Sequence, residues 1–275
     1  FDATTKERLS GIRRLEGDLP DLLADGAIRE VSAVIHGAAI TAAPERLGIS
    51  RAAHIRRNMD LLTATLDFAR GAGAERFLFL SSMGVFAAGD APAPEGRFTE
   101  ATEPTATCTY CAAKQAGELL PPSAADAGFT TLSLRLGNIF GAHEAVRESR
   151  QHLCLVSRMM AEARATGVIT VQTPNALREW SWLPDLAAGV VRLIVDLPAT
   201  GPRVIHAGTP PVLSDLDLAR AVADRLGGTT IRLAPPPHDP IRPPMASDVS
   251  SIFDSVNWTG MAQALDQMIP MEVEQ

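Results

Sequence analysis

The chain has 275 residues, 46% of them hydrophobic, which is enough apolar material for one α/β domain and a small second lobe. Its net charge of -7 and its lack of a Lys/Arg-rich block argue against nucleic acid as the main partner. It contains no run of about 18 apolar residues, so the sequence predicts no membrane-spanning segment.

The number of cysteines argues against a fold stabilised by several disulfides. Three cysteines are an odd number in a long chain, which predicts no disulfide framework and fits a reducing cytoplasm. Cys108 and Cys111 have the Cys-x-x-Cys spacing of redox pairs and of half a zinc site, but only Cys154 remains to complete a ligand set. We therefore expect no metal, and redox chemistry at this pair stays the less favoured alternative.

The first third of the chain predicts alternating strands and helices. Residues 13–19 read as a short strand with a Gly-Asp turn, followed by a short helix through 22–24, and 31–35 as a buried strand. Ser50 is expected to cap a long helix that ends at 71–73, and a strand over 76–80 follows. This order predicts parallel strands, right-handed crossovers and helices on both faces of the sheet.

One stretch carries a candidate for proton transfer. Tyr110, the only tyrosine, precedes Lys114 by four residues on a helix expected from about Thr107 to Leu120. Residues four apart share a helix face, so the ammonium group can lower the pKa of the phenol toward neutrality. Ser82, at the preceding strand end, could polarise the same substrate oxygen, so the group suits an alcohol whose hydride passes to a cofactor. A chance Tyr-x-x-x-Lys is the alternative.

The strand ends are expected to meet at one crevice. Small residues after the strand at 31–35 let a ligand approach the backbone, or simply pack tightly. Pro121 and Pro122 are expected to interrupt the tyrosine helix, and a strand over 129–136 leads to Gly137 and Asn138. Because the carboxyl ends of parallel strands meet at one edge, the residues after these three strands are candidates for a single ligand site.

The remainder of the chain has a looser pattern. Arg178 could clamp a phosphate or carboxylate with its planar fork, or pair with a surface acid. The further expected elements are a helix at 153–165, a strand at 168–171, a helix capped by Asp185 and ending near Leu197, a strand at 204–206, a helix from Ser214 and Asp215 to Leu226, a proline-rich linker at 234–244 and a helix at 260–269.

The ordered motifs resemble the extended short-chain dehydrogenase/reductase superfamily, in particular its NAD-dependent epimerase/dehydratase group. The matching motifs are Gly17-Asp18-Leu19, His36-Gly37-Ala38-Ala39, Asn58 on its helix, Ser81-Ser82-x-x-Val85-Phe86, Tyr110-x-x-x-Lys114, Arg135-Leu-x-Asn138-x-x-Gly141 and Arg178-Glu-Trp-x-x-x-x-Asp185. The resemblance implies an α/β fold with a Rossmann-like doubly wound parallel sheet. A dinucleotide-binding domain would span residues 1–141, and a smaller C-terminal substrate lobe would span 142–275, with about 177–207 returning to the core.

The resemblance also implies roles for individual residues. Tyr110 would be the general acid/base, with Ser82 and Lys114 as its catalytic partners. The implied cofactor-binding residues, besides Tyr110 and Lys114, are Asp2, Asp18, Leu19, Gly37, Ala38, Ala39, Asn58, Ser81 and Gly137. The implied substrate-binding residues are Ser82, Met83, Asn138 and Arg178, the arginine gripping the diphosphate in members that act on sugar nucleotides. NAD is the expected cofactor, with NADP as the alternative, and a cytoplasmic homodimer is expected.

The sequence departs from the family pattern in its phosphate-binding turn. The family begins with a strand and a Gly-x-x-Gly-x-x-Gly turn that receives a pyrophosphate at a helix N-terminus, and this sequence has no such motif. The sequence opens at Phe1 without a methionine, so we expect a missing upstream unit. Without that unit, pyrophosphate binding would be severely weakened and the chain could be inactive. Asp2 would bind the adenosine ribose and favour NAD.

A second departure bears on the type of reaction. In nucleotide-sugar 4,6-dehydratases the catalytic Ser or Thr is followed by Asp-Glu, whereas Met83-Gly84 follows Ser82 here. This disfavours dehydration and favours epimerisation or oxidation of a secondary alcohol of a sugar or sugar nucleotide. The alternatives are a simple dehydrogenase or reductase of a non-nucleotide sugar acid or small ketone, and a cofactor-binding regulator without turnover.

Overall fold

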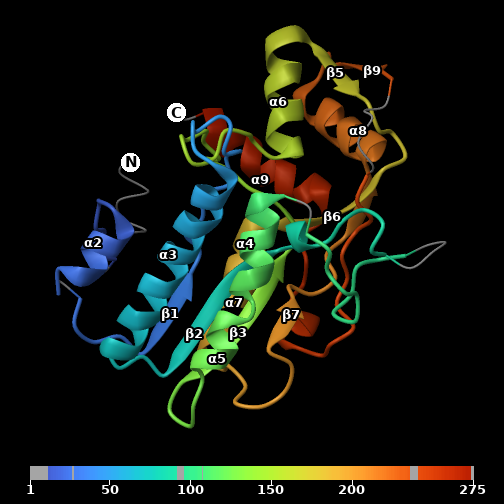
Figure 1. Ribbon diagram of the computed structural model, residues 1–275. Helices are drawn as coiled ribbons and strands as arrows, with labels where there is room; N and C mark the ends of the chain where they lie inside the picture. The colour runs from blue at the N-terminus through green and yellow to red at the C-terminus, as the bar shows by residue number, and fades with distance from the viewer. Residues whose placement is uncertain (1–11, 27, 92–95, 107, 236–240, 274–275) are drawn as a thin grey trace.

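A four-stranded parallel sheet lies at the centre of the fold (Figure 1). The computed structural model describes residues 12–26, 28–91, 96–106, 108–235 and 241–273. The strands of the sheet lie in the order β1-β2-β3-β7, with β1 at Ala33–His36, β2 at Arg76–Ser82, β3 at Thr130–Leu136 and β7 at Val204–His206. All three pairings are parallel, so the predicted Rossmann-like α/β fold is confirmed.

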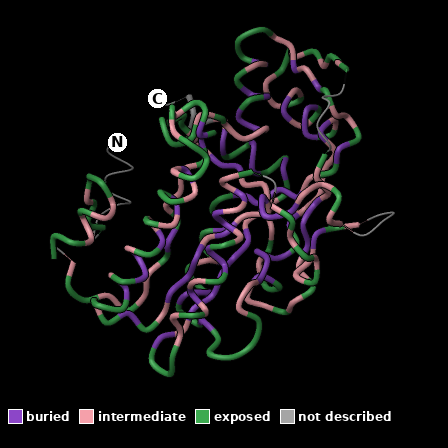
Figure 2. The backbone as a smooth tube through the Cα atoms, viewed as in Figure 1, coloured by how far each residue is buried: buried purple, intermediate pink, exposed green. Residues whose placement is uncertain are grey.

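Helices cover both faces of this sheet because β2 buries side chains on both. Phe77 and Phe79 pack toward α3 (Arg51–Gly71), whereas Leu78 packs toward α7 (Leu183–Val195) on the opposite face. This alternation follows from the two-residue period of a strand. Figure 2 shows the buried residues running along the strands of the sheet.

The tyrosine helix divides into two. α4 spans Thr109–Gly117, and a short helix, α5, spans Leu120–Ala124 with its prolines in the first turn. The prolines were expected to interrupt one helix, but they begin a second one. Proline is favoured in the first turn because the backbone N–H it lacks would have no partner inside the helix. α4 packs beside α3, in front of the sheet in the view of Figure 1.

Predictions near the start of the chain were less accurate. Residues 12–18 form no strand, and α2 spans Leu19–Ala24. A strand needs a neighbour to satisfy its backbone groups, and no described residue pairs with this segment. β1 begins at Ala33 rather than 31, and its Ile35 is 41% exposed instead of buried. The cause is that β1 forms the edge of the described sheet.

The prediction for the long helix was correct. Ser50 caps α3, its hydroxyl oxygen accepting the Ala53 backbone N–H at 3.1 Å, and the helix ends at Gly71 as expected. β2 extends two residues beyond its predicted end, so Ser81 and Ser82 belong to the strand. Their position at the end of β2 places them at the carboxyl edge of the sheet.

The C-terminal residues build two smaller sheets and a separate core (Figure 1). β4 (Asn138–Phe140) pairs with β6 (Leu177–Trp182), β6 pairs with β8 (Val212–Ser214), and β5 (Val168–Val171) pairs with β9 (Thr230–Leu233). The helices of this region are α6 (Leu155–Thr166), α8 (Asp215–Leu226) and α9 (Met261–Val273), and it contains the 3-10 turn η2 (Ile252–Ser255). A second 3-10 turn, η1 (Met83–Val85), directly follows β2.

Most C-terminal elements agree with their predicted ranges, but the cap of α7 does not. Ser214 caps α8 as expected, its hydroxyl oxygen accepting the Asp217 N–H at 3.0 Å. Trp182, not Asp185, occupies the N-cap position of α7. Asp185 lies within the first turn and accepts the Thr259 backbone N–H at 2.7 Å instead. Among the described residues, no helix has the length and apolar character needed to cross a membrane.

Candidate functional site

Three adjoining cavities follow the carboxyl ends of the strands. The inner cavity, of about 410 Å³, is lined by Gly37, Ala39 and Lys114, and shares Ser81 and Tyr110 with the central cavity. The central cavity, of about 800 Å³, also contains Ser82, Gly137 and Asn138 in its wall. The outer cavity, of about 680 Å³, shares Asn138 and is lined by Met83 and Arg178. The three strand ends therefore meet as the sequence predicted.

Tyr110 and Ser82 lie together in the central cavity. Tyr110 is in the first turn of α4, and Ser82 is the last residue of β2. The Ser82 oxygen accepts the Gly84 backbone N–H at 3.0 Å, which fixes its position. Burial raises the pKa of Tyr110 above its usual value, while a hydrogen bond with Ser82 and the charge of Arg150 act in the opposite direction. Tyr110 is therefore a protonated phenol at neutral pH.

Lys114 lies behind the tyrosine, one turn further along α4. Its buried ammonium group donates to the Leu80 carbonyl at 2.6 Å and lies 4.6 Å from the centre of the Phe79 ring. Burial lowers its pKa to about 8, while the charge of Glu118 raises it. The Tyr110 ring centre is 5.9 Å from the Lys114 nitrogen. The expected lowering of the phenol pKa toward neutrality is not found, because burial of Tyr110 outweighs its hydrogen bond with Ser82 and the charge of Arg150.

A buried ion pair lies below these residues, and sequence reasoning missed it. Arg135 on β3 donates to both oxygens of Glu118, at 2.8 and 2.7 Å, and both side chains are about 5% exposed. The Ser81 hydroxyl donates to the same carboxylate at 2.6 Å. Glu118 follows Lys114 by four residues, which is the one signal in the sequence that could have placed it beside the site. The network ties α4 to the ends of β2 and β3.

Glu179 fixes the loop that carries Gly137 and Asn138. The backbone N–H and side-chain amide of Asn138 donate to one Glu179 oxygen at 3.1 and 3.2 Å, and the Met245 N–H donates to the other at 3.0 Å. A Cβ atom on Gly137 would lie 2.2 Å from that first oxygen, so only glycine fits. Burial raises the pKa of Glu179. The sequence assigned this residue no role, although it belongs to the Arg-Glu-Trp motif.

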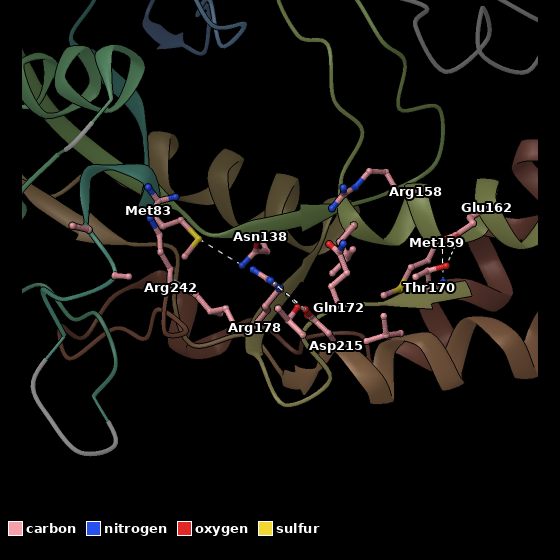
Figure 3. A pocket seen from close by; sticks show the side chains of 16 residues that line it. Met83, Asn138, Arg158, Met159, Glu162, Thr170, Gln172, Arg178, Asp215 and Arg242 are labelled. Atoms are coloured by element: carbon pink, nitrogen blue, oxygen red, sulfur yellow. Dashed lines mark hydrogen bonds and ion pairs between the residues drawn. The ribbon is translucent and has the colours of Figure 1, made fainter. Parts of the chain in front are cut away.

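The outer cavity is rich in guanidinium groups (Figure 3). Arg178 donates to buried Asp215 at 2.7 and 3.2 Å, and Arg158 and Arg242 line the same space. Arg178 thus makes an ion pair with a buried acid, rather than with the surface acid that one interpretation expected, and it lies in a cavity wall. Sequence reasoning missed Arg158 and Arg242, the latter because it lies in the stretch expected to be a linker. Figure 3 shows these arginines arriving from different elements.

The loop after β1 is held by Asn58 from α3. The Asn58 side chain accepts the Ile40 N–H at 2.9 Å and donates to the Ile40 carbonyl at 3.3 Å. This shapes the segment of Gly37, Ala38 and Ala39, whose first and last residues line the inner cavity. Asn58 is therefore a support for the loop and is itself buried.

Two described residues that were predicted to bind the cofactor, Asp18 and Leu19, do not line these cavities. Asp18 precedes α2 as its exposed N-cap residue, and Leu19 begins that helix. α2 lies beside α3 at the margin of the sheet in Figure 1, and neither residue lines the three cavities described above. Asp2 lies outside the described residues.

The bonding of the cysteines differs from the prediction. Cys108 and Cys111 form a disulfide across the first turn of α4, and Cys154 is free. An odd count of cysteines says nothing about a local pair, because the fold of one helical turn brings residues three apart together. In the described parts of the chain, no group of His, Cys, Asp and Glu could hold a metal ion.

Comparison with known proteins shows which family this chain belongs to. A model of the NAD dependent epimerase/dehydratase family matches residues 3–208, whereas no curated protein matches the chain. The UDP-glucose 4-epimerase of Bifidobacterium longum, solved in complex with NAD+ and UDP, is similar with a TM-score of 0.75 and 19% identity, over 100% of this chain and 88% of that one. The dTDP-glucose 4,6-dehydratase DesIV of Streptomyces venezuelae, with NAD and TYD bound, has a TM-score of 0.74 and 19% identity over 98% and 84%.

At such identities the solved structures show the shared fold alone. The family match is independent of them and spans most of the chain, including the strand ends and the Tyr110–Lys114 pair. The chain belongs to the NAD dependent epimerase/dehydratase family, a family of NAD-dependent enzymes.

Proposed function

We propose that this protein is an NAD-dependent oxidoreductase or epimerase that acts on a secondary alcohol of a sugar nucleotide. One observation carries the proposal: Tyr110 and Ser82 lie between a cavity lined by Lys114 and small residues and a cavity lined by three arginines. A dinucleotide on one side and an anionic substrate on the other would meet at the tyrosine. This is the arrangement that hydride transfer from an alcohol requires.

The residues of the inner cavity suit the ribose and nicotinamide half of NAD. Gly37 and Ala39 present little more than backbone, so a flat or bulky ligand can approach the loop closely. Lys114 supplies an ammonium group for ribose hydroxyls, and Gly137 supplies backbone groups at the central cavity. Bound NAD would accept or return the hydride at this point. The part of the chain described here supports no equivalent role for Asp18 or Leu19.

Proton transfer falls to Tyr110. Its raised pKa keeps the phenol protonated at neutral pH, which suits donation to a carbonyl oxygen during reduction. In the oxidative direction the phenol must first lose its proton, and the nearby Lys114 ammonium group would stabilise the phenolate. The Ser82 hydroxyl interacts with Tyr110 in the same cavity and would hydrogen-bond the same substrate oxygen.

The outer cavity supports the choice of a sugar nucleotide. Arg158, Arg178 and Arg242 place three permanent positive charges around it, and planar guanidinium groups bind phosphate oxygens in pairs. Asp215 holds two N–H groups of Arg178 and leaves the others for a ligand. The similar epimerase named above was solved in complex with NAD+ and UDP, and the diphosphate of such a ligand would suit these guanidinium groups.

Epimerisation or simple oxidation is favoured over dehydration. Met83 follows Ser82, and its sulfur lies 3.5 Å from the Asn138 amide nitrogen in the wall of the outer cavity. A thioether cannot donate or accept the proton that elimination of water requires. A simple dehydrogenase is the second candidate, and it differs from an epimerase in releasing reduced cofactor.

Replacing Tyr110 with phenylalanine tests the mechanism. We expect Tyr110→Phe to lower turnover about 10²–10⁴-fold, because it removes the proton donor and keeps the ring. NAD binding, measured by calorimetry, should survive. Turnover like that of the unaltered protein would contradict the role of Tyr110, and a loss of NAD binding would mean that the substitution acted through the structure.

Absorbance of the reduced nicotinamide distinguishes the candidate reactions. An epimerase should convert UDP-glucose to its 4-epimer with no net growth of this band, whereas a dehydrogenase should produce growth in step with product. NAD binding without either reaction would favour a non-catalytic regulator. The homodimer and the cytoplasmic location remain predictions from the sequence.

A further inference from the structure

The first turn of α4 contains a disulfide that the proposed reaction does not use. Cys108 and Cys111 are bonded, with Cα atoms 5.0 Å apart, and Tyr110 lies between them in the chain. Cys108 is exposed, whereas Cys111 is only 4% exposed and lies beneath the turn. One sulfur is thus open to a reagent in solution and the other is packed inside the protein.

Cys108 has the surroundings of a reactive sulfur. It is the N-cap residue of a nine-residue helix, and its sulfur accepts the Cys111 backbone N–H at 3.1 Å. Backbone donors and the positive end of a helix stabilise a thiolate there. The residue also lines a cavity of about 380 Å³, which gives a small dithiol access. Cys154 contrasts with it, because burial raises the pKa of that thiol to about 11.

The buried Cys111 sulfur lies near Gly84, as do the Ser82 and Tyr110 side chains. A Cβ atom built on Gly84 would lie 3.5 Å from the Cys111 sulfur, 3.3 Å from the Ser82 oxygen and 3.7 Å from a carbon of the Tyr110 ring. The three side chains therefore surround one point in the structure. A displacement of the Cys111 sulfur would therefore change the packing around Gly84, which the Ser82 and Tyr110 side chains also flank.

We propose that Cys108 and Cys111 form a dithiol–disulfide redox site whose oxidised form holds Tyr110 against Ser82. In the reductive step, a thiolate of an external dithiol attacks the Cys108 sulfur, the protein S–S bond breaks, and Cys111 leaves as a thiolate that takes up a proton. The second thiol of the reagent then attacks the mixed disulfide and releases Cys108. The reagent ends as a disulfide, and two electrons pass to the protein.

Reduction of the Cys108–Cys111 disulfide would change the distance between the two sulfurs enough to affect the Ser82–Tyr110 pair. A disulfide bond of about 2 Å becomes a non-bonded contact of about 3.5–4 Å, so the two sulfurs separate by about 1.5–2 Å and at least one of them moves by about 0.8 Å or more. A displacement of about 1 Å in a catalytic arrangement can lower turnover about 10²-fold. This consequence rests on the proposed function, and we expect reduction to lower turnover at least about tenfold.

Thiol trapping tests the redox site without any turnover. The full chain is equilibrated in buffers of oxidised and reduced dithiothreitol, alkylated with iodoacetamide and analysed by peptide mass spectrometry. Cys108 and Cys111 should be protected together in the oxidising buffer and alkylated together in the reducing buffer. Cys154 serves as the internal control, since its labelling should not follow the redox buffer. Alkylation of Cys108 and Cys111 in the oxidising buffer would overturn the proposal.

The link to Tyr110 has its own readouts. Turnover should fall on reduction and recover on reoxidation, Cys111→Ser should abolish this response, and Cys154→Ser should preserve it. Because Tyr110 is the only tyrosine, its ultraviolet absorbance titration reports the same link in a protein without turnover. The titration midpoint should differ between the two redox forms. Equal midpoints would overturn the link, whereas lack of turnover with a shifted midpoint would overturn only the proposed reaction.

Discussion

His206 illustrates how burial decides the charge of a single side chain. Its Nδ1 donates to the Ala246 carbonyl at 2.8 Å, and its Nε2 has no hydrogen-bond partner among the described residues. Burial lowers its pKa to about 4, so the ring is neutral at pH 7. A Glu100 oxygen lies 3.9 Å from Nδ1, yet a neutral imidazole forms no ion pair with it. The residue is a structural member of the core beside Phe86.

This pKa predicts a loss of stability in acid. Between pH 6.5 and about 4 the unfolded chain binds a proton that the folded His206 does not, so stability falls as the pH is lowered through this window. The shift corresponds to about 3 kcal/mol for this side chain. His206→Asn can keep the hydrogen bond to Ala246 and does not titrate. Urea unfolding at pH 7 and pH 4 should show a smaller loss in the variant, and an equal loss would refute this account.

At the scale of elements, α4 must approach the sheet closely to present both Tyr110 and Lys114. Gly117, the last residue of α4, packs tightly against β2 and α3. A Cβ atom there would lie 2.8 Å from the Phe79 ring and 3.1 Å from a Leu62 methyl group. The glycine is therefore needed for its small volume rather than for an unusual backbone conformation.

Gly117→Ala should separate α4 from β2. We expect a loss of about 1–3 kcal/mol in the free energy of unfolding, since overpacking a tight contact forces side chains or backbone to shift. Gly71→Ala is the matched control, because Gly71 is also the last residue of its helix and nothing lies within 4 Å of an added Cβ. That control should be neutral or stabilising. Denaturant unfolding measures both, and equal effects would argue against the close contact.

At the scale of the whole molecule, the inner and outer cavities lie on different parts of the fold, and each adjoins the central cavity, the inner one at Tyr110 and the outer one at Asn138. The inner cavity depends on β1, β2 and α4, and the outer one on α6, β5 and β6. NAD in the inner cavity and UDP-glucose in the outer cavity should therefore stabilise the protein through different residues. A ligand at about 100 times its Kd adds about 2.7 kcal/mol to stability if it binds only the folded chain.

Two variants should separate these contributions. Lys114→Ala should weaken the thermal stabilisation by NAD and spare that by UDP-glucose. Arg178→Lys keeps a positive charge beside Asp215 but loses the guanidinium fork, so it should weaken the UDP-glucose response and spare the NAD response. Thermal unfolding with each ligand alone measures both effects. Loss of both responses in either variant would contradict the separate cavities.

The sequence determined the features that depend on neighbours along the chain. Ser50 predicted the start of α3, the four-residue spacing placed Tyr110 and Lys114 on one helix, and the alternation of strands and helices gave the parallel sheet. These follow from local rules of capping, helical periodicity and crossover connections, which act within a few turns or one βα unit. The family match over residues 3–208 agrees with this prediction.

The surroundings of these residues depend on contacts between distant parts of the chain. Glu179 reaches Asn138 across 41 residues of sequence, Arg242 reaches the Phe86 carbonyl across 156, and the burial that raises the pKa of Tyr110 involves distant elements. The exposed edge of β1 and the absent strand at 13–19 likewise depend on which segments pair. Burial and long-range contacts are properties of the packed chain, because desolvation is set by every element that covers a group and no short motif records them.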